Sequence, residues 1–221
     1  MTAAYVDLGC TDYTAAYDLQ LRLVEKRRCG TVGDTFLVTE HPATFTLGRR
    51  GGRENLMVSE AFLLEKGIPL VHIERGGDIT FHGPGQLVIY PILHLREAGL
   101  SVTDYVFRLE ETMVRLAAAQ GLTAARDPRN HGVWAQDKKL GSVGIAIRHG
   151  ISFHGLALNV CLDSIPFSWV NPCGLTGVKM TTMSRELGWE VSLAEVKEEL
   201  PGILTEVFDR EFCPLNMELS L

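Results

Sequence analysis

Hydrophobic and polar residues recur with two different periods along the 221 residues of this chain. Over residues 103–120, Val106, Leu109, Met113 and Leu116 follow the three- and four-residue spacing of one buried helix face, so this stretch is predicted to be a helix. Elsewhere, short apolar runs rich in β-branched residues favour strands. The strands predicted in this way span residues 3–8, 35–39, 43–47, 69–74, 86–95, 132–136, 139–148 and 151–160.

Capping residues predict two further helices, one toward each end of the chain. Thr11 or Asp12 is expected to cap the first. Ser192 and Glu195 have the spacing of a capping box for the second, which Pro201 is expected to kink or split. Helices thus interrupt the strands irregularly, which favours an α+β fold of mixed β-sheets flanked by helices. Because no repeat or linker is visible, residues 1–221 are expected to form one domain.

Composition and charge narrow the classes of function. The chain is 46% hydrophobic and 22% charged, with a net charge of −6, so binding to nucleic acid through a broadly basic surface is not expected. No apolar run is long enough to span a bilayer, so no membrane association is expected either. The N-terminal residues lack the features of a signal peptide, and a cytoplasmic location is therefore expected.

The cysteines are scattered, odd in number and without a CxxC pair, which predicts neither a disulfide framework nor a structural zinc site. The seven histidines lack metal-binding spacing, so no metal is expected. Cys173 differs from the other cysteines because Pro172 and Gly174 place it on a turn, where a thiol can act as a nucleophile. The alternative is an incidental thiol on a turn.

A second unusual stretch is the glycine-rich segment over residues 75–86, which reads RGGDITFHGPGQ. Its glycines allow backbone amides to approach a ligand closely, although their spacing fits neither a Walker A loop nor a Rossmann dinucleotide-binding loop. His82 either faces a pocket or makes a structural hydrogen bond in a tight turn. Arg75 either contacts a substrate or pairs with Glu74 or Asp78 at the surface.

Two lysines begin the strand predicted over residues 139–148. In a regular strand Lys139 shares a face with Gly141 and Val143, and Lys138 shares the other face with Ser142, so only one lysine can point inward. The following strand, HGLALNV over residues 154–160, is either a core strand or a pocket wall whose small residues suit an acyl chain.

Taken together, these segments resemble the lipoyl(octanoyl) transferase family. The resemblance covers roughly residues 40 to 185, and the glycine-rich segment and the cysteine turn are its most specific parts. The matching blocks are Glu40-His41-Pro42 with Thr46-Leu47-Gly48-Arg49, the segment 75–86, Lys139 to Ile145 with Phe153 to Asn159, and Asn171 to Gly174 with Gly177 to Met180.

The resemblance implies a fold shared with biotin and lipoate protein ligases, and a two-step acyl transfer. Cys173 would take the octanoyl group from octanoyl-acyl carrier protein as a thioester and pass it to a lysine of a lipoyl domain. The acceptors would be 2-oxoacid dehydrogenase complexes and the glycine-cleavage H protein. No cofactor is implied, and ATP is not needed because the donor thioester is already activated.

The same resemblance implies roles for individual residues. Lys139 would favour the thiolate of Cys173 and later accept a proton from the incoming amine, with Lys138 and Lys179 as the other candidates for this role. Amides of the Gly76-Gly77 turn or near Val143-Gly144 would stabilise the oxyanion. The residues implied to bind substrate are Arg75, Gly76, Gly77, Asp78, Ile79, Thr80, Phe81, His82, Ser142, Val143, Gly144, Gly155, Leu156 and Ala157.

Three alternatives compete with this function. An ATP-dependent lipoate or biotin ligase of the same fold would not need a nucleophilic cysteine. A transferase acting between carrier domains would use another donor. A non-catalytic module that holds an acyl carrier or lipoyl domain would tolerate loss of Cys173. Because the implied protein partners are typically acidic, a basic rim of Arg49, Arg50, Arg53 and Arg75 is expected to dock them, unless these charges are merely solvated.

Overall fold

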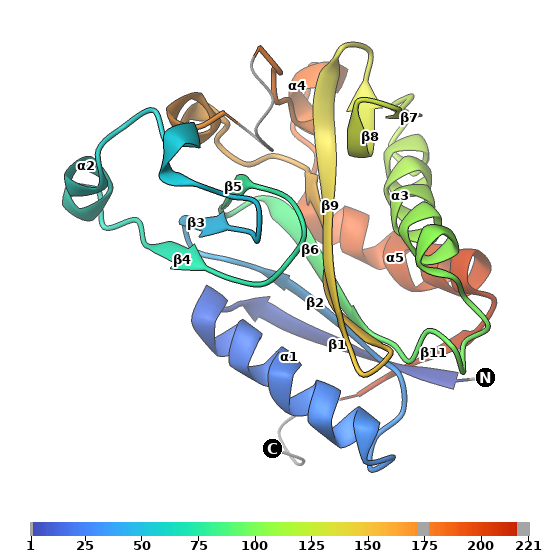
Figure 1. Cartoon of the computed structure of the whole chain (residues 1–221). Coiled ribbons are helices and arrows are strands. Elements are labelled where there is room, and N and C mark those ends of the chain that lie inside the picture. The colour runs from blue at the N-terminus through green and yellow to red at the C-terminus, as the bar shows by residue number, and fades with distance from the viewer. Residues whose placement is uncertain (1, 172–176, 216–221) are drawn as a thin grey trace.

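Two β-sheets organise the part of the chain that the computed structural model describes, residues 2–171 and 177–215 (Figure 1). The strands are β1 (Thr2–Cys10), β2 (Thr35–Glu40), β3 (Thr44–Leu47), β4 (Leu70–His72), β5 (Ile79–His82), β6 (Gln86–Ile92), β7 (Ala125–Asp127), β8 (Asn130–Ala135), β9 (Lys138–Arg148), β10 (Ile151–Asn159) and β11 (Glu211–Pro214). The larger sheet has the order β11-β1-β2-β6-β10-β9-β8-β7, and the smaller sheet has the order β4-β3-β5.

Both sheets are mixed. Strand β1 runs parallel to β2 and β11, and β3 runs parallel to β4, whereas the other neighbours are antiparallel. The helices are α1 (Tyr13–Arg28), α2 (Glu60–Glu65), α3 (Val102–Ala119), α4 (Met183–Leu187) and α5 (Leu193–Phe208), with 3-10 turns η1 (Arg53–Asn55) and η2 (Ile165–Trp169). The predicted α+β class of mixed sheets flanked by helices is confirmed.

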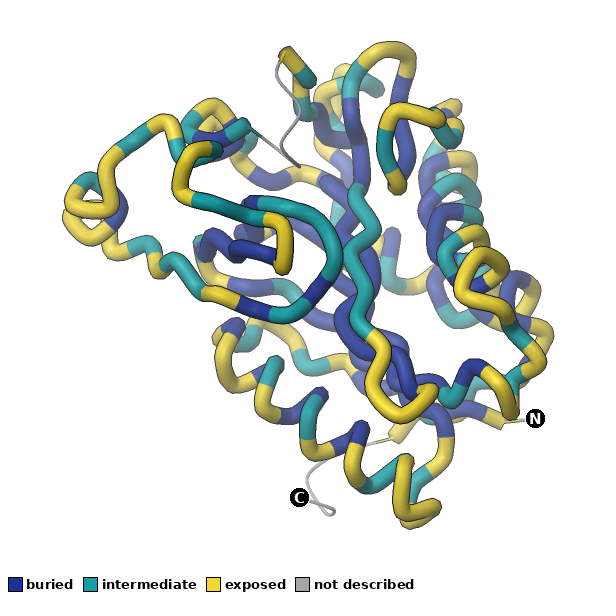
Figure 2. Tube along the Cα trace, in the orientation of Figure 1, coloured by how far each residue is buried: buried dark blue, intermediate teal, exposed yellow. Residues whose placement is uncertain are grey.

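Helices cover both faces of the larger sheet. Figure 1 shows α1 on one face and α3 with α5 on the other. Leu19 and Leu23 of α1 pack with β2, β6 and β10, while Leu109 and Met113 of α3 pack with α5 against the opposite face. The central strands β2, β6 and β10 and the inward sides of the helices are accordingly buried (Figure 2). The predicted 103–120 helix is confirmed, because its apolar stripe is the face that meets the sheet.

The two terminal helices show where local sequence rules hold and where they fail. Asp12, not Thr11, caps α1 by accepting the amide of Ala15. The capping box expected at Ser192 is wrong, because this side chain makes no capping hydrogen bond. The split expected at Pro201 is also wrong, since α5 runs through it. Buried Leu200 and Leu204 on either side hold the helix against the sheet.

The smaller sheet has its own apolar core. Phe45 and Leu47 of β3 and Ile79 and Phe81 of β5 pack with Phe167 of η2. The strand predicted over residues 69–74 is shorter, Leu70–His72, and the strands predicted over 35–39 and 43–47 fall in different sheets. The smaller sheet therefore stands beside the larger one and places its β5 strand near β9 and β10 (Figure 1).

A β-bulge lies near the start of β9, between Lys139 and Gly141. Trp134 of β8 pairs with Lys139, but the next residue, Val133, pairs with Gly141, so β9 contains one extra residue, Leu140. The faces predicted from regular alternation are therefore wrong in this stretch. Lys139 shares its face with Ser142 rather than with Gly141, because paired residues of neighbouring strands lie on the same face.

Candidate active site

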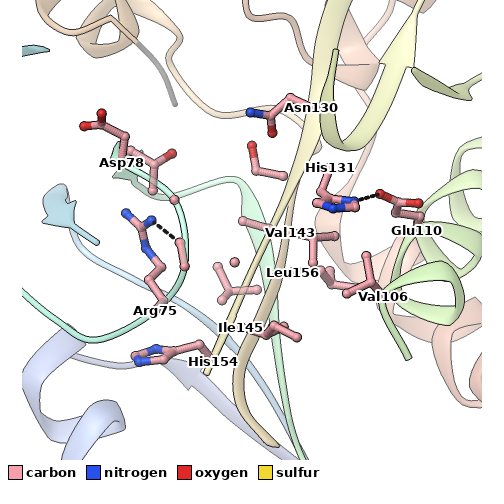
Figure 3. A pocket seen from close by; sticks show the side chains of 18 of the residues that line it. Arg75, Asp78, Val106, Glu110, Asn130, His131, Val143, Ile145, His154 and Leu156 are labelled. Carbon is pink, nitrogen blue, oxygen red and sulfur yellow. Dashed lines mark hydrogen bonds and ion pairs between the residues drawn. The ribbon is translucent and has the colours of Figure 1, made fainter. Parts of the chain in front are cut away.

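A cleft of about 870 Å³ opens between the smaller sheet, β9, β10 and α3 (Figure 3). The predicted substrate-binding residues that line this cleft are Arg75, Gly76, Gly77, Asp78, Thr80, His82, Ser142, Val143, Gly144, Gly155, Leu156 and Ala157. Segments from three distant parts of the sequence thus meet around one cavity.

Two of the predicted substrate-binding residues do not line the cleft. Ile79 and Phe81 are 0% and 3% exposed and belong to the core of the smaller sheet. They alternate along β5 with Thr80 and His82, and successive side chains of a strand point to opposite faces. The expectation that the whole segment faces substrate is therefore wrong for these two residues.

Glycines bring backbone close to backbone along one side of the cleft, which we call the glycine wall (Gly76, Gly77, Gly144 and Gly155). Gly144 pairs with Gly155 across β9 and β10. A Cβ on Gly144 would lie 3.3 Å from the carbonyl oxygen of Gly76. The Gly76 amide donates to the carbonyl of Ile145 at 2.9 Å, so it is not available to stabilise an oxyanion.

Arg75 is buried at the base of the glycine wall rather than exposed at a rim. Its guanidinium donates at 2.8 Å to both the carbonyl and the hydroxyl oxygen of Thr46, and at 3.1 Å to the carbonyl of Gly76. Arg75 cannot belong to the expected docking rim, because these contacts keep its charge inside the protein. Arg49 and Arg50 are exposed, and Arg50 lines the cleft.

Lys139 is the buried lysine among the candidates. Its side chain is 0% exposed, and its Nζ donates to Oδ1 of Asn130 at 2.8 Å, at the edge of the cleft. Lys138 instead forms an ion pair with Glu186 at 2.9 Å, and Lys179 is exposed. The bulge at Leu140 explains this difference, since it turns Lys139 to the same face as the glycine wall.

Cys173 lies outside the described residues, so its position is not part of the site geometry. The described residues on both sides of it are anchored. The amide of Asn171 donates to the carbonyl of Asn55 at 2.8 Å. Lys139 bridges the segment on the other side: its amide donates to the carbonyl of Lys179 at 2.8 Å, and its carbonyl accepts the amide of Thr181 at 2.9 Å.

Sequence reasoning missed a buried cluster of aromatic and histidine side chains behind the glycine wall. His41 Nε2 lies 2.7 Å from the hydroxyl of Tyr90, and Tyr13 stacks on His82 at 5.4 Å between ring centroids. Burial holds the pKa of His82 well below its usual value, and it raises the pKa of Tyr90 well above its usual value. The cluster is therefore polar but uncharged. Its members come from α1, the turn between β2 and β3, β5 and β6, so no single motif marks the whole cluster.

The opposite side of the cleft carries charges, and we call it the charged wall (Glu110, Arg126 and His131). Figure 3 shows Glu110 and His131 across β9 from Arg75 and His154. Oε1 of buried Glu110 accepts the amide of Gly132 at 2.9 Å and lies 3.3 Å from Nδ1 of His131. Arg126 contacts the second carboxylate oxygen at 3.3 Å. Sequence reasoning missed this wall too, because Glu110 interrupts an otherwise apolar helix face.

Other kinds of site find no support in the described residues. No group of three or more His, Cys, Asp or Glu side chains in residues 2–171 and 177–215 is arranged to hold a metal ion. No helix in these ranges is both long and apolar enough to cross a membrane. The cysteines described, Cys10, Cys29, Cys161 and Cys213, are free and exposed.

The fold and the cleft first define a class. A structure of a bi-partite lipoate protein ligase and its E2 lipoyl domain from Thermoplasma acidophilum matches with a TM-score of 0.77 at 18% identity, covering 98% of this chain and 88% of the other. The biotin protein ligase of Aquifex aeolicus in complex with biotin and ATP matches with a TM-score of 0.57 at 14% identity, covering 94% and 70%. The chain has the fold of lipoate and biotin protein ligases.

Sequence comparisons then identify the family. The model of the lipoyl protein ligase A/B catalytic domain matches residues 12–204. An octanoyltransferase from Desulfotalea psychrophila is 55% identical over 206 residues, covering 92% of each chain. This chain therefore belongs to the lipoyl protein ligase A/B catalytic-domain family, among its octanoyltransferases, and is an acyltransferase. The family resemblance predicted from the sequence is confirmed.

Proposed function

We propose that this enzyme transfers an octanoyl group from octanoyl-acyl carrier protein to a lysine of a lipoyl domain through a thioester on Cys173. The octanoyltransferase relatives support the acyl group and the link to protein lipoylation. The observation that carries the mechanism is the placement of Lys139. It is the buried lysine, it points to the face of the glycine wall, and its backbone is bonded to Lys179 and Thr181, a few residues after Cys173.

In the first step, the thiolate of Cys173 attacks the carbonyl carbon of the donor thioester. A carbon–sulfur bond to the enzyme forms, the bond to the donor sulfur breaks, and the departing thiolate takes a proton. An ammonium beside the cysteine favours its reactive thiolate form, which is the role proposed for Lys139. The contact with Asn130 Oδ1 holds the amine of Lys139 at the edge of the cleft.

In the second step, the ε-amine of the acceptor lysine attacks the acyl-enzyme. An amide bond forms, the bond to Cys173 breaks, and one proton passes from the amine to the protein. Lys139 is proposed to take this proton after giving up its own to the departing donor. No oxidation and no ATP enter either step, because the energy of the donor thioester drives both.

The cleft suits an acyl chain along the glycine wall. Backbone lies close to backbone at Gly144 and Gly155, and Ala157 continues the same face, so a flat slot remains for methylene groups. With the Gly76 amide engaged by Ile145, the amide of Gly77 and the amides near Val143 and Gly144 are the proposed oxyanion donors. The exposed Arg49 and Arg50 are proposed to face acidic protein partners at the mouth of the cleft.

The decisive experiment is the intact mass of the purified protein after mixing with octanoyl-acyl carrier protein alone. The expected result is a gain of one octanoyl group on Cys173, absent in Cys173→Ser and retained in Cys161→Ser, a control that removes another exposed thiol. A non-catalytic module would gain no mass and would keep its function in Cys173→Ser.

Adding ATP separates the ligase alternative. If transfer to a lipoyl domain required ATP and free octanoate, the enzyme would be a ligase and the proposal would be wrong. If the mass gain came instead from an octanoylated lipoyl domain or H protein, and not from acyl carrier protein, the donor named above would be wrong while the thioester step would stand.

A further inference from the structure

A line of buried polar side chains crosses four strands behind the cleft. We call it the Thr46–Asn159 network; its members are Thr46 on β3, His82 on β5, Gln86 on β6 and Asn159 on β10, each no more than 6% exposed. Oγ1 of Thr46 lies 3.4 Å from Nε2 of His82, Nδ1 of His82 lies 2.8 Å from Oε1 of Gln86, and Nε2 of Gln86 donates to Oδ1 of Asn159 at 2.9 Å.

Each end of this network meets the active site. At one end, Arg75 of the glycine-rich segment donates to the hydroxyl of Thr46 at 2.8 Å. At the other end, Nδ2 of Asn159 donates to the carbonyl of Thr181 at 3.0 Å. The amide of Thr181 in turn donates to the carbonyl of Lys139 at 2.9 Å. Hydrogen bonds therefore run without interruption from the substrate segment to the backbone of the buried lysine.

The direction of donation is fixed at each step. Nε2 of Gln86 also lies 3.2 Å from the carbonyl of Phe81, which can only accept, so this atom must be the amide nitrogen. Its oxygen then faces His82, and Nδ1 of His82 must carry the hydrogen. The carbonyl of Thr181 fixes the amide of Asn159 in the same way. Every donor thus points from Arg75 toward Thr181.

This direction settles the state of His82. Nδ1 donates, and burial beside the Arg75 cation disfavours a second proton, which lowers the pKa of His82. Nε2 is therefore an acceptor, and the hydroxyl of Thr46 donates to it because Arg75 already occupies a lone pair of that hydroxyl. His82 is held as the neutral Nδ1–H tautomer. It is not free to act as a general base.

We infer that the Thr46–Asn159 network is a positioning device that holds the backbone of Lys139 and residues 179–181 in register with the glycine-rich segment. The inference rests on the proposed function, because the register matters only if Cys173 and Lys139 act together on an acyl group in the cleft. Buried polar networks with every member satisfied specify one arrangement, whereas a partly satisfied network is costly. Breaking one link should therefore displace Lys139 without removing it.

The test compares Thr46→Val, which keeps the side-chain shape but removes the hydroxyl, with Thr46→Ser, which keeps the hydroxyl. Gln86→Glu adds a test of direction, since a carboxylate can accept from His82 but cannot donate to Asn159. Thr39→Val is the matched control: Thr39 is also fully buried, but its hydroxyl contacts the carbonyls of Gly9 and Glu40, outside the network.

The readout is the pH profile for alkylation of Cys173 by iodoacetamide, followed by peptide mass, which needs no acyl donor. In Thr46→Val and Gln86→Glu, the midpoint of the alkylation profile is expected to move upward by about one pH unit. This is the change in thiol pKa expected when the contact between the thiolate and the Lys139 ammonium is weakened. Thr46→Ser and Thr39→Val should keep the parent profile. Equal midpoints in the parent and in both breaking variants would overturn the inference.

Two further measurements separate the inference from the proposed function. The ¹⁵N shifts of His82 should show a protonated Nδ1 and a bare Nε2 at neutral pH; the opposite tautomer would overturn the assigned direction. Acylation by octanoyl-acyl carrier protein should fall roughly tenfold to a hundredfold in Thr46→Val at saturating donor, as expected for a misplaced group. If the parent itself is not acylated, the proposed function fails, whereas the alkylation profiles and the tautomer still decide the inference.

Discussion

The two walls of the cleft are built by opposite means. The glycine wall is shaped by backbone: Gly144 lies against Gly155, and the amide of Gly76 is bonded to Ile145. The charged wall is shaped by side chains, where Glu110 holds a backbone amide, a histidine and an arginine at once. Added side-chain volume should therefore destabilise the glycine wall, whereas loss of one charged partner should destabilise the charged wall. Substitutions of each kind can test this contrast.

The largest expected effect is from Gly155→Ala in the glycine wall. A Cβ there would lie 2.1 Å from the carbonyl oxygen of Ile89 and 2.8 Å from Cδ of Pro91. Because both atoms belong to the neighbouring β6, the sheet itself must shift, and a loss of about 3 kcal/mol or more in the free energy of unfolding is expected. Denaturant unfolding measures this loss.

Gly76→Ala is the matched control for added volume in the same wall. A Cβ on Gly76 would meet the carbonyl of Ile145 at 3.6 Å, an ordinary contact. Its free energy of unfolding is expected within about 0.5 kcal/mol of the parent. Equal losses in both variants would show that the wall responds to any lost glycine rather than to volume.

The next effect is from Glu110→Ala in the charged wall. Removing this buried carboxylate leaves the amide of Gly132 and the Arg126 guanidinium short of a partner. A loss of about 2–3 kcal/mol in the free energy of unfolding is expected. Glu111→Ala, which removes a more exposed partner of the same arginine, should cost under about 1 kcal/mol. A reversed order would contradict the picture of Glu110 as the centre of this wall.

A smaller, pH-dependent effect is expected from Glu74→Gln beside the glycine wall. His154, 3.9 Å away, and the hydroxyl of Tyr17 lower the pKa of Glu74 to about 2 from a usual value of 4.5. Because the pKa is depressed in the folded state, the carboxylate stabilises the fold above about pH 4.5, and this stabilisation is lost as the pH falls toward 2.

The parent should therefore be more stable than Glu74→Gln by about 1–2 kcal/mol at pH 6, after allowance for partial exposure, and the two should converge near pH 2. Thermal unfolding across this pH range gives the comparison. Glu65→Gln on the exposed side of α2 should show no such convergence, because it starts equal to the parent. If the difference in stability between the parent and Glu74→Gln stayed constant at all pH values, the cause would be packing rather than charge.

The smallest expected effect concerns the mouth of the cleft. Reversing both Arg49 and Arg50 to Glu is expected to raise the KM for octanoyl-acyl carrier protein a few-fold at low salt and to change little at high salt, because exposed charges are screened. Reversing Arg22 and Arg28, both exposed on α1, changes the net charge equally and should leave KM unaltered. An equal effect of both pairs would indicate global charge rather than a docking rim.

Much of this molecule could be predicted from local patterns, and the exceptions have physical causes. The helix over residues 103–120 and most strands follow from their periodicity, because each buries one face. The sequence predicts that Pro201 kinks or splits α5, but the helix is not split, because packing on both sides of the proline outweighs the lost hydrogen bond. Tyr13 and Tyr90 could not be predicted to meet, since only the assembled sheet brings α1 and β6 together.

The candidate site, too, was predicted from the sequence only in part. Thr80 and His82 line the cleft, whereas Ile79 and Phe81, which alternate with them, do not, because the segment is a strand and not an open loop. Motif resemblance carries no information on which side chains of a motif face the ligand. Lys139 was chosen from the family pattern, and the structure adds the reason that it is buried, which regular alternation could not supply.

The extra residue in β9, Leu140, changes which alternate residues of the strand face the cleft before and after the bulge. Lys139, before Leu140, lies on the face that Ser142 and Gly144 occupy after it, one position out of step with regular alternation. The chemistry of the cleft therefore depends on the register of β9 as well as on the identities of its residues. If the same residues formed a regular strand, Lys139 would share the face of Gly141 and turn toward Met113 and the α3 core. Deleting Leu140 would instead place Lys139 two positions before Ser142 and keep it on the cleft face without a bulge. A register change that closes the bulge and keeps Leu140 would therefore separate the lysine from its site while leaving every side chain in the sequence.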